Sequence, residues 1–166
     1  MKKLHLIRHA KSSWASDSLA DVDRPLNPRG WEACRTMAPQ MVKAGCPFEA
    51  VFCSPALRAQ STIERIAQHL PDRDISWRTD NALYTFDAQE LLRWCRKLDD
   101  SRLAVVVVGH NAAITDLCNQ MGDRFIENVP TCGYVQLAFE QKSWQDLSAG
   151  SGKLLSFLKP KMFLSK

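Results

Sequence analysis

Two arginines and two histidines follow closely after short apolar runs in this sequence: Arg8, His9, Arg58 and His110. A guanidinium carries a permanent charge and a planar fork of donors that fits phosphate oxygens. A neutral imidazole can attack phosphorus and carry the phosphoryl group covalently. If the fold brings the four side chains together, these residue types predict a pocket for a phosphoryl group.

Each motif also has an ordinary structural interpretation. Arg8-His9 is compatible with a basic pair at a strand end, and His110 with a buried or capping histidine. Gly109 allows a tight turn before His110, next to a predicted helix N-terminus where free N–H groups favour anions. Arg58 falls in the first turn of a predicted helix, where the macrodipole disfavours a cation unless a bound dianion offsets it. The alternative is an exposed arginine, but the three motifs together favour the pocket.

Strand and helix signals alternate along the chain, which is typical of a βαβ sheet protein. The predicted strands are residues 3–8, 50–53, 75–77, 103–108, 133–139 and 153–158. The predicted helices are residues 28–44, 54–70 and 88–98, with a fourth beginning near residue 111. The last two strands have no helix between them and are expected to pair antiparallel on one edge. Parallel strands bind ligands beyond their carboxyl ends, so this sheet would gather the arginines and histidines at one edge.

Local signals refine these elements. Four consecutive valines at 105–108 predict a central strand that is buried on both faces. The segment 11–28 is long for a loop of a compact domain, which favours a functional role. The predicted helix caps are Asn27 with Pro28 after it, Ser54 and Asp87, and Gly45 is predicted to end the first helix. We therefore predict one domain over residues 1–166, a three-layer α/β/α sandwich with a mostly parallel sheet.

Composition narrows the function classes. The chain is 45% hydrophobic and 24% charged, as in ordinary globular proteins, and its net charge is +4. This charge weakly favours an anionic substrate, but no Lys/Arg block suggests a nucleic-acid partner. No apolar run approaches the ~20 residues of a membrane span, and charged residues interrupt the N-terminal run too early for a signal peptide. We expect a cytoplasmic protein with no membrane partner.

The six cysteines show no C-x-x-C spacing and fall mostly within predicted helices and strands. We expect them to be free and mostly buried. No cluster of histidine, cysteine and carboxylate residues has the spacing of metal ligands, so we predict neither a metal nor a cofactor.

The motifs resemble those of the histidine phosphatase superfamily, also called phosphoglycerate mutase-like. The matching residues are Arg8-His9-Ala10, Ser54-Pro55-x-x-Arg58-Ala59-x-x-Thr62 and Gly109-His110. The loop Asp23-Arg24-Pro25-Leu26-Asn27-x-x-Gly30 and the small size are similar to the SixA-like branch, the phosphohistidine phosphatases. The resemblance spans residues 4 to 119. Ala10 replaces the usual glycine, a small change that this branch tolerates.

The resemblance implies a role for each residue. His9 would be the nucleophile that becomes phosphorylated, while Arg8 and Arg58 would bind the phosphoryl oxygens. His110 would complete the pocket, and Asn111 is a further predicted substrate-binding residue. This agrees with phosphoryl transfer as positioning plus charge stabilisation, for which no metal is needed when arginines supply the charge.

A second departure concerns the general acid. Many superfamily members place a glutamate after the third strand, whereas this chain has none between residues 81 and 87. A phosphoester gains much from a general acid, but phosphohistidine leaves as imidazole, with a pKa of about 6.5, and needs less help. Glu90, Asp23 and Tyr84 are weak candidates for proton transfer.

The sequence therefore predicts a phosphatase that hydrolyses phosphohistidine on proteins through a covalent intermediate. Two alternatives remain open. One is a phosphatase of the same mechanism acting on metabolite phosphoesters or phosphotyrosine, and the other is a non-catalytic phosphoprotein-binding module. The expected partner is a phosphohistidine-bearing protein, and nothing in the sequence demands more than a monomer or weak dimer.

Overall fold

Six strands form one sheet in the computed structural model, which describes residues 1–164. The strands are β1 (Lys2–Arg8), β2 (Val51–Cys53), β3 (Trp77–Thr79), β4 (Ala104–Gly109), β5 (Tyr134–Phe139) and β6 (Gly152–Leu158). Their order across the sheet is β3-β2-β4-β1-β5-β6. The first four in this order are parallel, whereas β5 pairs antiparallel with both β1 and β6. The predicted mostly parallel sheet with an antiparallel pair at one edge is confirmed.

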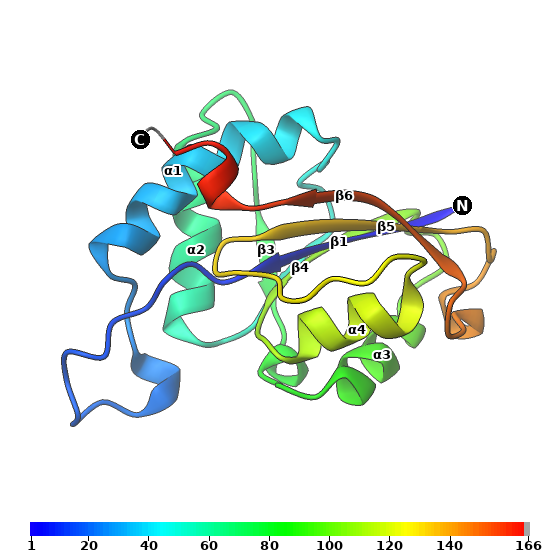
Figure 1. Cartoon of the computed structure of the whole chain (residues 1–166), viewed down its shortest axis with the longest axis horizontal. Helices are drawn as coiled ribbons and strands as arrows, with labels where there is room; N and C mark the ends of the chain where they lie inside the picture. The colour runs from blue at the N-terminus through cyan, green and yellow to red at the C-terminus, as the bar shows by residue number, and fades with distance from the viewer. Residues whose placement is uncertain (165–166) are drawn as a thin grey trace.

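Four α-helices cover the two faces of the sheet: α1 (Pro28–Lys43), α2 (Leu57–Gln68), α3 (Ala88–Arg96) and α4 (Ala113–Met121). Figure 1 shows α1 and α2 on one side of the sheet and α3 and α4 on the other. Short 3₁₀ helices lie in the connections: η1 (Asp21–Asp23), η2 (Asn81–Leu83), η3 (Trp144–Asp146) and η4 (Pro160–Met162). The arrangement is the predicted three-layer sandwich.

The valines of β4 divide the core into two clusters. Val105 and Val107 belong to the cluster under α3 and α4, and Val106 and Val108 to the cluster under α1 and α2. All four are fully buried because side chains alternate across a strand that has a helical layer on each face. The apolar run therefore holds β4 rigidly between β2 and β1, which fixes the residue that follows it.

Helix caps agree with the sequence at most positions. Asn27 Oδ1 accepts from the Gly30 amide at the start of α1, and the carboxylate of Asp87 accepts from the Gln89 amide at the start of α3. The first helix ends at Lys43, followed by Gly45 with φ of 102°, a left-handed conformation that glycine adopts without strain.

Three local predictions are wrong. The third strand is β3 at residues 77–79, rather than at 75–77. α2 begins at Leu57 with Ala56 as its N-cap, and the Ser54 hydroxyl accepts from the Ala56 amide and is hydrogen-bonded to His110. The tight turn expected at Gly109 does not form: Gly109 is the last residue of β4, its φ is not positive, and a Cβ there would make only ordinary contacts.

The segment between β1 and α1 folds back on itself and projects beyond the sheet edge (Figure 1, blue). A single bridge pairs Ser12 with Leu26 across its base, and η1 lies between them. Gly30 of α1 packs so closely on this segment that an added Cβ would lie 2.3 Å from the Lys11 carbonyl oxygen. The loop is therefore anchored at both ends and presents η1 in a fixed place.

Candidate active site

Three neighbouring parallel strands deliver the candidate residues to one edge of the sheet. Arg8, the last residue of β1, pairs in register with Gly109, the last residue of β4. Cys53, the last residue of β2, pairs with Val108. The three strands therefore end at the same level of the sheet. The residues that follow them, His9, His110 and Ser54, lie together at this edge, as expected beyond the carboxyl ends of parallel strands.

The backbone determines which nitrogen of His9 is free. His9 Nδ1 lies 2.7 Å from the Ala10 carbonyl oxygen, which can only accept, so Nδ1 carries the proton. The Ala10 amide in turn donates to Thr62 Oγ1 of α2, which ties this turn to the helix. Burial, followed by the charges of nearby arginines, lowers the pKa of His9 to about 4. The ring is therefore neutral at pH 7, with the lone pair on Nε2.

Arg58 lies between the two histidine rings. Its Nε is 3.4 Å from His9 Nε2, and its Nη2 is 3.4 Å from His110 Nδ1. The residue is buried, at 2% exposed. The guanidinium charge therefore lies directly against both imidazole rings.

His110 is held from the opposite side by Ser54, whose Oγ lies 2.8 Å from His110 Nε2. Its ring centroid is 5.3 Å from that of His9. Burial, followed by the charges of His9 and Arg58, lowers its pKa to about 3. The Tyr84 and Phe86 rings pack against its edges at centroid distances of 5.4 and 5.2 Å.

Arg8 at the end of β1 also lines the site. Its Nη1 donates to the Val129 carbonyl at 2.9 Å, while its Nε is buried and has no hydrogen-bond partner among the described residues. A buried donor without a hydrogen-bond partner is energetically costly. An anion bound in the site would provide a partner for the Arg8 Nε–H.

Arg8, His9 and Arg58 line one cavity of about 650 Å³, together with Trp14, Asp21 and Arg24. Arg24 stacks on the Trp14 ring, with its guanidinium carbon 3.3 Å from the ring centroid. The cavity therefore combines a cationic floor with a partly aromatic rim. His110 is not among the lining residues, but its ring lies against His9 and Arg58, so the structure brings together all four of the arginines and histidines singled out in the sequence.

Asp21 is the residue that sequence reasoning missed. Its carboxylate accepts from Arg58 Nη2 and Arg24 Nη1, each at 3.0 Å, and from the Tyr84 hydroxyl. Its carbonyl oxygen accepts from Arg58 Nη1 at 2.7 Å. These partners, Tyr84 first, hold the pKa of the carboxyl well below its usual range. The only hint in the sequence was the unusual length of the loop that carries it.

Asp21 also corrects the interpretation of Arg58. Arg58 does lie in the first turn of α2, where a cation is disfavoured. The sequence led us to expect that a bound dianion alone would compensate for this unfavourable charge. In this structure the Asp21 carboxylate compensates for it. The outer edge of the guanidinium is thus occupied, and its inner edge faces the histidines.

The remaining predicted residues lie elsewhere. The Asn111 side chain accepts from Thr115 and donates to Asn128 Oδ1 and the Val129 carbonyl, so it braces the loop that holds Arg8 and is not among the residues lining the cavity. Glu90 accepts from Thr85 and lines a different hollow. Neither Asp23 nor Tyr84 lines the cavity, but the Tyr84 ring packs against His110 and its hydroxyl donates to Asp21, so Tyr84 is the one weak proton-transfer candidate that contacts the site.

No group of three or more histidine, cysteine, aspartate or glutamate residues within residues 1–164 has a geometry that could hold a metal ion. No helix in the same range is both long and apolar enough to cross a membrane. All six cysteines lie within this range, buried and free, as predicted.

Comparison with known proteins places these motifs in context. The sequence model of the histidine phosphatase superfamily, branch 1, matches residues 4–91. An uncharacterised protein of Mycobacterium tuberculosis is 30% identical over 166 residues, covering 93% of this chain and 100% of its own length. The structure of the protein histidine phosphatase SixA complexed with tungstate has a TM-score of 0.78 at 20% identity, covering 96% of this chain and 98% of its own. Phosphoserine phosphatase from Entamoeba histolytica, in complex with 3-phosphoglyceric acid, has a TM-score of 0.67 at 18% identity, covering 99% and 100% of the two chains.

Proposed function

The chain belongs to the histidine phosphatase superfamily, and from this premise we propose that it hydrolyses phosphohistidine on proteins through a phosphorylated His9. One observation supports this proposal most directly. His9 is neutral, and it lines a cavity that offers arginine donors but no protonated carboxyl group. The likeness of the fold to SixA, a protein histidine phosphatase, supports the same substrate.

The first step is attack by His9. The Nε2 lone pair forms a bond to phosphorus as the bond from phosphorus to the substrate imidazole breaks, and the departing ring nitrogen takes the electron pair. Arg58 and Arg8 bind the equatorial oxygens, and a protonated His110 Nδ1 would donate to a third. Burial, and after it the charges of His9 and Arg58, lower the pKa of His110, and a bound dianion favours protonation because it counters those charges.

The second step returns the enzyme to its resting form. Water attacks phosphorus on the side opposite His9, and the His9 Nε2–phosphorus bond breaks. Nδ1 keeps its proton, which is hydrogen-bonded to the Ala10 carbonyl oxygen. His9 therefore leaves as neutral imidazole and inorganic phosphate is released. A substrate phosphohistidine whose second ring nitrogen is protonated leaves the same way in the first step.

The state of Asp21 supports a P–N substrate over a P–O one. It is the only aspartate or glutamate among the described residues that line the cavity, and Tyr84, Arg58 and Arg24 keep it ionised. An alkoxide leaving group would need a proton that this carboxylate does not carry. A departing imidazole needs none from the enzyme when the second ring nitrogen of the phosphohistidine is protonated.

The proposal is tested by metal-free turnover of a phosphohistidine peptide and of 4-nitrophenyl phosphate, with His9→Ala as the control. We expect kcat/KM to favour the phosphohistidine peptide by at least an order of magnitude, and both activities to vanish in the variant. A preference for the ester would instead identify a phosphoester phosphatase with an overlooked acid. Tungstate binding without turnover of either substrate would identify a binding module.

A further inference from the structure

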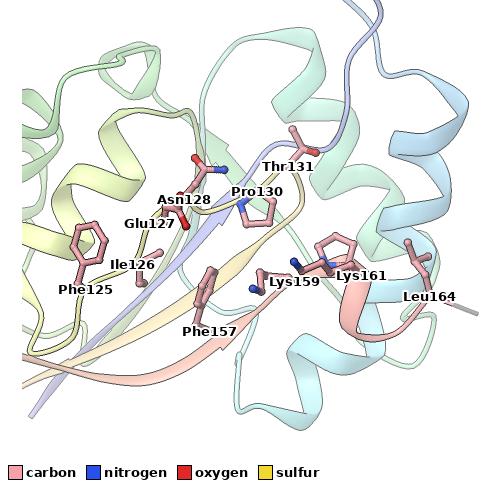
Figure 2. Close-up of a pocket in the computed structure, with 11 residues that line it drawn as sticks. Phe125, Ile126, Glu127, Asn128, Pro130, Thr131, Phe157, Lys159, Lys161 and Leu164 are labelled. Atoms are coloured by element: carbon pink, nitrogen blue, oxygen red, sulfur yellow. The ribbon is translucent and has the colours of Figure 1, made fainter.

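A second hollow of about 560 Å³ lies between the segment 125–131 and the end of β6 with η4. Figure 2 shows the side chains that line it, with Phe125 and Glu127 on one wall and Lys159 and Lys161 on the other. We call this hollow the side groove. Phe157 of β6 also lines it.

The apolar wall of the side groove is held in a fixed place. Asn119 of α4 accepts from the Ile126 amide and donates to the Ile126 carbonyl, each at 2.7 Å. The next side chain along, Phe125, is nevertheless 81% exposed. An aromatic ring displayed on anchored backbone is the kind of residue that dominates protein interfaces, since little entropy is lost when it is covered.

The side groove adjoins the active-site cavity. Thr131 lines both hollows. The backbone between them also touches the catalytic residues, because the Val129 carbonyl accepts from Arg8 and the Cys132 amide donates to the carbonyls of Arg8 and His9. A polypeptide that enters the cavity with its phosphohistidine can therefore continue into the side groove.

The charged residues of the side groove favour an acidic occupant. Lys159 and Lys161 face one carboxylate, that of Glu127, so the lining carries a net positive charge. The Lys159 ammonium lies 5.4 Å from the Phe157 ring centroid, which places a positive charge beside an aromatic side chain of the side groove.

We propose that the side groove binds the segment of the substrate protein that flanks the phosphohistidine, and that it selects acidic and apolar side chains there. The inference rests on the proposed function, because only a protein substrate has such a segment. The aromatic residues would cover the apolar side chain, and the lysines would pair with the carboxylates.

The test uses two phosphohistidine peptides of equal length. One carries Glu and Leu at several positions on both sides of the phosphohistidine, and the other carries Gln and Ala at the same positions. We expect kcat/KM to be roughly tenfold higher for the acidic peptide, as two partly exposed ion pairs and one apolar contact would provide. Screening predicts that this ratio shrinks in 0.5 M salt.

Matched variants separate the side groove from the cationic rim of the cavity. Lys159→Glu/Lys161→Glu should bring the ratio close to one, and Phe125→Ala should lower it severalfold. The control, Lys142→Glu/Lys153→Glu, makes the same charge change at exposed positions that line neither hollow, and it should keep the wild-type ratio. Turnover of free phosphohistidine should be unchanged in all three variants, which also shows that each is folded.

The outcomes distinguish the inference from the proposed function. Turnover of both peptides at equal rates, or a ratio that survives Lys159→Glu/Lys161→Glu, would overturn the side groove and leave the function intact. Absence of phosphohistidine turnover would overturn the function. In that case, polarisation of a dye-labelled, unphosphorylated acidic peptide tests the groove directly, and lack of binding would reject it. Concentration-dependent dimerisation abolished by Phe125→Ala would mean that a second copy of the chain occupies this surface, contrary to the proposal.

Discussion

At the scale of single residues, one backbone carbonyl prepares the proposed nucleophile. The Ala10 oxygen holds the proton of His9 on Nδ1 and leaves Nε2 free to attack. A side chain at position 10 does not alter this contact, and the Ala10 methyl is fully buried without displacing it. The replacement of the family's usual glycine by alanine is therefore compatible with the same chemistry.

The low pKa of His9 gives a direct prediction. Because burial lowers the pKa to about 4, the ring should stay neutral as the pH falls from 7.5 to 5 and gain a proton only near pH 4. An NMR titration of the imidazole C–H signals, with His9→Gln to assign the resonance, measures this. A midpoint near the ordinary value of about 6.5 would contradict the proposed resting state.

Asp21 should separate binding from turnover. Its carboxylate steers Arg58 but also repels an incoming anion. Asp21→Asn is therefore expected to bind tungstate roughly tenfold more tightly while kcat falls about tenfold, since one charge is lost and Arg58 is less well oriented. Calorimetry and steady-state kinetics measure the two effects. If affinity and kcat fall together, Asp21 serves only the stability of the loop.

Arg58→Ala tests the guanidinium itself. We expect kcat to fall about 100- to 1,000-fold, the usual effect of removing a principal donor to a transition-state anion. Arg65→Ala provides a control on the same helix, because Arg65 stacks on the Trp31 ring away from the cavity. Comparable losses in the two variants would assign the effect to α2 and not to the site.

At the scale of elements, the ends of the parallel strands were the most predictable feature. An apolar run that stops at a charged residue marks a strand leaving the core, and this located Arg8, His9 and His110. β3 was displaced by two residues because so short an edge strand is defined by its pairing with β2, which no local pattern records. Asp21 was missed for a related reason: its partners Arg58 and Tyr84 lie far away in the sequence, and only the tertiary fold brings them together.

The contact between α1 and the segment after β1 is another tertiary feature with a testable consequence. Gly30→Ala would force a Cβ against the Lys11 carbonyl, since the ideal separation is only 2.3 Å. We expect a loss of about 3 kcal/mol in unfolding free energy from this overpacking, despite alanine's better helix propensity. Urea denaturation measures it, with the exposed neighbour Arg29→Ala as the control. A neutral result would show that the loop is not anchored there.

At the scale of the whole molecule, three buried histidines make stability depend on pH. Burial is the main cause that lowers the pKa values of His5 and His9 to about 4 and that of His110 to about 3. The unfolded chain, with histidine pKa values of about 6.5, therefore binds more protons, and the folded state loses stability as the pH falls below 6.5.

Each of these histidines should reduce the unfolding free energy by about 2 kcal/mol between pH 7 and pH 5. Urea unfolding at the two pH values measures the total. His9→Gln should lose less unfolding free energy between pH 7 and pH 5 than the wild type does, because one of the three protonations is removed. An identical pH dependence in the variant would mean that His9 is not shielded from solvent.

The position of β1 in the middle of the sheet has a consequence for synthesis on the ribosome. β1 is the first strand to emerge, yet its neighbours in the sheet are β4 and β5, from the second half of the chain. A nascent chain therefore exposes an apolar strand with unpaired edges until residues 104–139 have been made, and such exposed edges invite aggregation. Because His9 and His110 meet only when β1 and β4 pair, phosphatase activity should be the last property gained during refolding. Truncated nascent chains should lack it altogether.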